Sequence, residues 1–247
     1  MKKLFTLSFL VLGFVAQAQV MPVGFITQIA SKAMITTEPS GAVNGVALTT
    51  QPVIRITDAS GNTVTSSTVN VVASIASGTG GTLSGTTTVA AVNGVATFTD
   101  LVLSGTAGNF TLTFTPTSLT AATSNSFALS VGTVSKAMIT TQPSGAAAGT
   151  AFTTQPVIRI TDASGNTVTS STVNVVASIA SGTGTLSGTT TVAAVNGVAT
   201  FTDLVLSGAT GNFTLAFTPT SLAAATSSSF ALGVGTASKA MITTEPS

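Results

Sequence analysis

Two loops of identical sequence carry the side chains best suited to bind a cation. Asp58 and Asn62 flank the first loop, and Asp162 and Asn166 flank the second. Their oxygens suit Ca²⁺ between adjacent domains, but this ion takes about 6–8 oxygen ligands, usually with several carboxylates. At most two other acidic residues occur in the roughly 100 residues around each loop. We therefore expect Asx turns, in which the Asp caps its own loop, and no metal site.

A carboxylate pair is the second chemistry to consider. Glycoside hydrolysis would need Asp58 and Asp100 about 5–10 Å apart with one pKa raised, and nothing in the sequence makes their loops converge. The glycine run at 78–81 resembles a phosphate loop, but it lacks the Gly-Lys-Ser/Thr ending and precedes a strand. We therefore predict no catalytic and no cofactor-binding residues.

Composition excludes most other chemistry. The 247 residues include no His, Cys, Trp or Tyr, with 7 Lys and Arg against 6 Asp and Glu. Imidazole bases, thiol nucleophiles and His/Cys metal sites are therefore absent. A net charge of +1 cannot form a basic face for phosphates, which excludes nucleic acid as a partner.

The first 18 residues have the pattern of a signal peptide. Lys2 and Lys3 precede an apolar run at 4–15, and Ala16-Gln17-Ala18 fits a signal-peptidase site. The run is too short to span a bilayer, which needs about 20 residues, and no later apolar stretch is longer. We expect a protein exported to the cell surface or the medium, with no transmembrane span in this chain.

One sequence is repeated through the rest of the chain. The run SKAMITT begins at Ser31, Ser135 and Ser238. The two complete copies differ at 12 positions and one gap, including Glu38 against Gln142. A period near 103 residues is the size of an independent domain and too long for a solenoid repeat.

This periodicity divides the chain into five parts. They are a signal peptide (1–18), a spacer (19–31), repeat 1 (32–135), repeat 2 (136–238) and the first strand of a truncated third repeat (239–247). We expect neighbouring repeats to be each other's partners, and the sequence to be a fragment of a longer array.

Each repeat has the pattern of an all-β domain. Thr and Val dominate between closely spaced Gly and Pro residues, which favours short strands. In repeat 1 we predict seven strands, at 33–37, 50–57, 68–76, 82–90, 96–103, 109–115 and 123–131. Asn93-Gly94 predicts a hairpin turn.

Alternating apolar positions identify the buried face of these strands. Phe110, Leu112 and Phe114 share one face, and Thr residues occupy the other. Phe98 and Leu101 are out of phase, which predicts a bulge or bend near residues 99–100. The core is expected to contain Phe98, Phe110, Phe114 and Phe127, and their copies Phe201, Phe213, Phe217 and Phe230. The pattern predicts tandem Greek-key β-sandwiches of about seven strands each.

Three segments resemble the bacterial immunoglobulin-like repeats of invasin- and intimin-type adhesins. Ile54–Val64 is similar to their D-A-x-G-N-x-V strand–turn–strand, Asn93–Phe98 to G-x-A-x-F, and Gly108–Thr113 to G-x-Y-x-L-x. The resemblance covers residues 32–238, with Phe110 and Phe213 where that family commonly has Tyr. It implies an immunoglobulin-like fold and a role in surface adhesion.

The resulting prediction is a non-catalytic stalk or adhesin of the cell surface, with a glycan or protein as its possible surface ligand. One alternative is a passive spacer of a larger surface enzyme or sorted protein. Another is a carbohydrate- or ice-binding module that uses the outward threonines Thr111, Thr113 and Thr115. We expect these threonines to serve instead as good strand residues that keep an uncharged face soluble.

Overall fold

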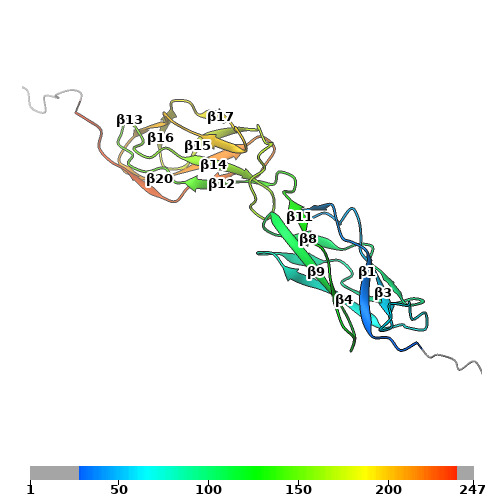
Figure 1. Ribbon diagram of the computed structural model, residues 1–247. Coiled ribbons are helices and arrows are strands. Elements are labelled where there is room, and N and C mark those ends of the chain that lie inside the picture. The colour runs from blue at the N-terminus through cyan, green and yellow to red at the C-terminus, as the bar shows by residue number, and fades with distance from the viewer. Residues whose placement is uncertain (1–27, 238–247) are drawn as a thin grey trace, which may run out of the picture.

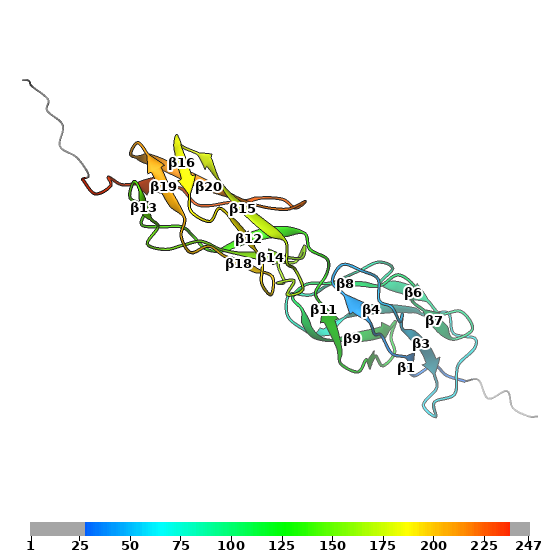
Figure 2. The same ribbon diagram turned by 90° about the horizontal axis from the view of Figure 1, so that it is seen from above.

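The computed structural model describes residues 28–237, which form two β-sandwich units placed end to end (Figure 1). The expected signal peptide, most of the spacer and the expected strand at 239–247 lie outside the described residues. No helix occurs between residues 28 and 237, and hence none long and apolar enough to cross a membrane. The view from above shows the same elongated arrangement (Figure 2).

Repeat 1 contains eleven strands. They are β1 (Lys32–Thr37), β2 (Ala42–Val43), β3 (Val53–Thr57), β4 (Asn70–Ser77), β5 (Thr82–Ser84), β6 (Thr88–Ala90), β7 (Val95–Thr97), β8 (Val102–Ser104), β9 (Gly108–Pro116), β10 (Ala122–Thr123) and β11 (Phe127–Ser130). One sheet has the order β1-β3-β7. The other has the order β2-β11-β9-β4-β6, with β10 beside β9 and a separate β5-β8 ribbon. This division of strands between two facing sheets is immunoglobulin-like.

Repeat 2 has most of the same plan. Its strands are β12 (Lys136–Thr141), β13 (Thr150–Ala151), β14 (Val157–Thr161), β15 (Asn174–Ser181), β16 (Gly184–Ser187), β17 (Thr191–Ala193), β18 (Val198–Thr200), β19 (Val205–Gly208), β20 (Gly211–Pro219), β21 (Ala225–Thr226) and β22 (Phe230–Leu232). The exception is its short strand β13, which pairs with β19, beside β16. The pairing of Lys136 with Thr161 copies that of Lys32 with Thr57. The all-β fold predicted from the alternation is confirmed.

Three of the seven expected strands divide in two, and β2 adds a short strand that was not expected. The strand expected at 82–90 is interrupted because Asp100 accepts hydrogen bonds from both the backbone and the hydroxyl of Thr86. The strand at 96–103 breaks at residues 98–101, where a bend was expected. The strand at 123–131 is interrupted by Ser124, whose buried hydroxyl accepts a bond from the Leu112 amide.

The expected Asn93-Gly94 turn forms, and Val92 and Val95 exchange two backbone hydrogen bonds across it. Asn93 and Gly94 have φ angles of 50° and 76°, as a type I′ turn requires. The flanking strands nevertheless pair elsewhere, β6 with β4 and β7 with β3. The turn therefore carries the chain from one sheet to the other.

Each unit has its own hydrophobic core. Phe98 and Phe114 pack with ring centroids 5.5 Å apart in repeat 1, and Phe201 and Phe217 repeat that geometry. Phe110 is 1% exposed, and its ring lies so close to Gly78 that a Cβ there would be 2.1 Å from it. Part of the glycine run therefore serves close packing. Phe127, expected in the core, is only partly buried.

Candidate functional site: the joint between the repeats

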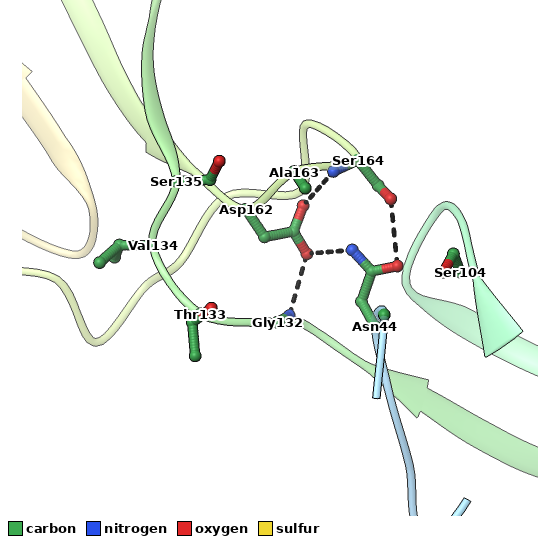
Figure 3. Close-up of a pocket in the computed structure, with 10 residues that line it drawn as sticks. Asn44, Ser104, Gly132, Thr133, Val134, Ser135, Asp162, Ala163 and Ser164 are labelled. Atoms are coloured by element: carbon green, nitrogen blue, oxygen red, sulfur yellow. Dashed lines mark hydrogen bonds between the residues drawn. The ribbon is translucent and has the colours of Figure 1, made fainter. Parts of the chain in front are cut away.

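The two units meet where the loop after β14 contacts the end of repeat 1 (Figure 3). This loop, residues 162–166, brings Asp162 against Asn44, which follows β2. Asp162 is 1% exposed and Asn44 is 7% exposed. Polar side chains such as these are usually exposed to water, and their burial here shows that the two units pack against each other.

The loop holds its shape by bonds to its own backbone. The amides of Ser164 and Asn166 donate to Oδ1 of Asp162 over 3.0 and 2.9 Å. The Asp162 amide donates in return to the Asn166 carbonyl over 2.9 Å. Short polar side chains favour such Asx turns, and the turn expected from the sequence is present.

The second carboxylate oxygen faces the other unit. Oδ2 of Asp162 accepts bonds from Asn44 Nδ2 and from the Gly132 amide, both over 2.9 Å. Asn166 Nδ2 donates to the same oxygen over 2.9 Å. Five N–H groups therefore surround this buried carboxylate, and no Lys or Arg forms an ion pair with it in the described residues.

These donors keep Asp162 ionised. Burial by itself raises the pKa of the carboxyl, but the hydrogen bonds from Gly132, Asn166 and Asn44 outweigh burial and hold the pKa below its ordinary value. Hydrogen bonds to the charged form have this effect on any carboxylate. The hydrogen bonds of the joint therefore stabilise the charged form of Asp162.

Two asparagine side chains complete the contact. Oδ1 of Asn44 accepts from the Ser164 hydroxyl over 3.0 Å and from the Gly105 amide over 2.9 Å. Asn166 donates from Nδ2 to the Gly105 carbonyl and accepts at Oδ1 from the Ala107 amide, both over 2.8 Å. Five hydrogen bonds thus cross from one unit to the other.

A cavity of about 210 Å³ lies beside these groups. Its lining includes Asn44, Gly132, Asp162 and Ser164. A cation bound to Asp162 would have to displace N–H donors that already occupy both carboxylate oxygens. Residues 28–237 also contain no group of three or more Asp, Glu, His or Cys side chains that could hold a metal ion. The arrangement is suited to mechanical coupling of the two units.

The other candidate residues stay in separate local networks. Asp58 bonds to Asn62, whereas Asp100 bonds to Thr86. The same bonds from Thr189 to Asp203 lower the pKa of that carboxyl. No hydrogen bond in the described residues links the Asp58 network to the Asp100 network.

The outward threonines are engaged within their own sheet. Thr111 shares a 2.7 Å hydrogen bond with Ser77, and Thr113 donates to the Ala122 carbonyl. Repeat 2 has Ala216 in place of Thr113. The regular row of free hydroxyls that a sugar- or ice-binding face would use is therefore not kept along the molecule.

Sequence reasoning placed Asp162 and Asn166 near a domain boundary but missed their partners. Asn44 is the partner that bonds to the loop through its side chain. The sequence marks this position only as a difference between the two copies, because Ala148 occupies its place in repeat 2. Gly105, Ala107 and Gly132 contact the loop through backbone groups, and a Cβ on Gly132 would be 2.8 Å from the Asn44 carbonyl oxygen.

No protein-family model matches the sequence, and no curated protein matches it. Among solved structures, the chain is similar to the Escherichia coli adhesin FdeC, with 20% identity over 84% of this chain and 65% of that chain and a TM-score of 0.39. It thus spans slightly less than two-thirds of that solved chain.

Two further solved structures are similar to the chain at equally low identity and TM-score. The D00-D0 domain of intimin has 14% identity over 83% of this chain and 99% of that chain, with a TM-score of 0.42. A β-glycosidase from Bacteroides vulgatus has 14% identity over 83% of this chain but 25% of its own length, with a TM-score of 0.35. At these identities and TM-scores, the likenesses carry no inference about activity.

Proposed function

We propose that this chain is a non-catalytic stalk, exported to the cell surface or the medium, that holds an adhesive or other module away from its point of attachment. The observation that supports the proposal most strongly is the joint, where the buried Asp162 carboxylate accepts bonds from Asn44 and Gly132 of the preceding segment. A joint with five cross-unit hydrogen bonds resists bending, which a spacer under load requires.

Separate cores give the stalk its modular construction. The core of repeat 1 and the core of repeat 2 share no residue, so units 32–135 and 136–238 are proposed to fold independently. The chain has no cysteine, so each unit depends on packing alone. Charged residues make up 5% of the sequence, so stiffness should depend little on ionic strength.

Small-angle X-ray scattering of the full chain tests this function. A stalk requires an elongated particle whose maximum dimension is the same in 10 mM and 1 M salt. A particle that bends freely, or that collapses as salt rises, would refute the stalk and leave the units as loosely tethered beads.

A further inference from the structure

In repeat 1, the segment that leads the chain into its second sheet lies beside the strand by which the chain leaves. β2 pairs with β11 in parallel, with Ala42 opposite Leu129 and Val43 opposite Ser130. The Asn44 amide extends this pairing with a 3.0 Å hydrogen bond to the Ser130 carbonyl. The entering and leaving segments are therefore bonded directly to each other.

Repeat 2 keeps this contact, although β13 pairs with β19. Ala147 forms a parallel bridge with Gly233, which directly follows β22. The Gly233 amide donates to the Ala146 carbonyl over 2.9 Å, and the Ala148 amide donates to the Gly233 carbonyl over 3.1 Å. We call the two equivalent contacts, residues 42–44 with 129–130 and residues 146–148 with 233, the terminal-strand contacts.

The direction of these strands decides how a pull along the molecule acts on the contact. The ends at residues 28 and 237 lie at opposite ends of the elongated molecule (Figure 1, Figure 2). β2 leads into Asn44 and β11 leads into Gly132, and both of these residues bond to Asp162 at the joint. A pull from the N-terminal side therefore draws β2 away from the joint, while a pull from repeat 2 draws β11 toward it. The two neighbours are pulled in opposite directions along their own length.

This direction of loading gives the contact a high barrier to rupture. Sliding two paired strands past each other breaks the hydrogen bonds between them together, whereas peeling a strand from its end breaks them one at a time. Forced unfolding is governed by such a barrier and not by the equilibrium stability. β1 precedes β2 in the chain but pairs with β3 in the other sheet, so detachment of β1 leaves the contact of β2 with β11 in place.

We propose that the terminal-strand contact bears the tension in each unit and sets the force at which the stalk extends. The inference rests on the proposed stalk function and adds how the units resist a pull. In repeat 1 the contact is also coupled to the joint, because Oδ2 of Asp162 accepts bonds from Asn44 Nδ2 and from the Gly132 amide. One carboxylate therefore connects repeat 2 to both strands of the contact.

Constant-force pulling on single full-length chains, with handles at the two chain ends, tests the proposal. Ala148→Pro removes the amide that bonds to Gly233 without deleting a polar side chain, and it should shorten the lifetime of one of the two units about threefold to tenfold. Ile158→Val, a change at a buried position in the other sheet, is the matched control. It should lower the melting temperature and leave the lifetime under force unchanged.

The same variant pulled from other points separates loss of the contact from general damage to the fold. Handles at Val92→Cys and Val195→Cys, both exposed positions, enclose only one partner of each terminal-strand contact. Tension between these points does not slide the two partners past each other. Ala148→Pro should then leave the lifetimes unchanged.

Repeat 1 provides a second comparison that does not depend on repeat 2 remaining folded. Asn44→Ala removes only the side-chain bonds, whereas Asn44→Pro also removes the amide bond to Ser130. Under end-to-end tension, Asn44→Pro should shorten the lifetime of repeat 1 relative to Asn44→Ala.

The proposal is overturned if neither proline shortens the lifetime under end-to-end tension, or if Ala148→Pro shortens it equally with both sets of handles. Scattering from the same chains distinguishes this failure from that of the stalk. Elongated particles whose lifetimes do not change would remove only the role of the terminal-strand contact, whereas freely bending particles would remove the stalk.

Discussion

Asn44 Nδ2 donates a 2.9 Å hydrogen bond to Oδ2 of Asp162, joining side chains 118 positions apart in the sequence. The bond lies in the interface between two otherwise separate β-sandwiches, and both residues are buried. A hydrogen bond to a buried charged group is worth more than one between neutral groups at a surface. The relative orientation of the two units therefore depends on a few named atoms.

Asn44→Ala gives the joint the residue that repeat 2 has at Ala148. The change removes one of five donors to Asp162 and the acceptor used by Ser164, and it should cost the joint about 1–3 kcal/mol. Nitrogen-15 relaxation should show the two units tumbling together in the wild type and more independently in the variant. Asn125→Ser, a natural difference away from the joint, is the control, and equal loosening in both variants would contradict the assignment.

Asp162→Ala and Asp58→Ala form a matched pair, because the same loop is docked in one unit and open in the other. The amides of Gly132 and Ala107 donate to the docked loop and should exchange slowly with solvent. Asp162→Ala should remove this protection, while Asp58→Ala should leave it unchanged. Loss of protection in both variants would mean that the two loops are coupled through the fold and not through the joint.

The joint should weaken in acid. The pKa of Asp162 is lower in the folded chain than its ordinary value of about 4, so its ionised form stabilises the joint. This stabilisation is fully present above the ordinary pKa and is lost as the pH falls through the lowered one. Scattering from pH 7 to 2 should show added bending only below about pH 4. An onset near neutral pH would point to another group.

Calcium should have little effect on the joint. The oxygens of Asp162 already accept bonds from five N–H groups, and a hard cation would have to compete with all of them. Titration calorimetry with Ca²⁺ should give no binding heat, and the melting temperature should not move. A saturable heat that disappears in Asp162→Ala would show that the ion, and not the hydrogen bonds, stiffens the molecule.

Phe110→Ala should destabilise repeat 1 by about 3–5 kcal/mol, because the ring is fully buried and packs on Gly78. Phe152→Leu should cost less than about 1.5 kcal/mol, since repeat 1 has Leu48 at that position and both residues are buried. Thermal unfolding measures both changes. A Phe110→Ala chain that melts like its parent would refute the assignment of the core.

The alternation of apolar residues was sufficient to predict the fold because it is a local signal. Phe110, Leu112 and Phe114 are buried as the pattern indicated, and the break between Phe98 and Leu101 lies where the phase changes. The divided strands were not predictable in this way. Side chains distant in sequence, such as Asp100 acting on Thr86, interrupt the pairing.

For a similar reason, the sequence predicted the loop that forms the joint but not the residues that the loop contacts. The Asp162 loop has a recognisable turn pattern, but its partners lie in another domain, and three of them bind it through backbone groups. Asn44 differs from Ala148, but the sequence does not distinguish this substitution from the other differences between the two copies. Only the packing of the two units shows that this difference lies at the contact.

A distance distribution across the joint tests the central claim most directly. The chain has no cysteine, so spin labels can be attached at Val92→Cys and Val195→Cys, equivalent sites that are 69% and 70% exposed. Double electron–electron resonance should give one narrow distribution in the otherwise wild-type chain and a broad one when Asn44→Ala is added. A broad distribution in both, or a narrow one that Asn44→Ala leaves unchanged, would contradict a stalk stiffened by the Asn44–Asp162 contact.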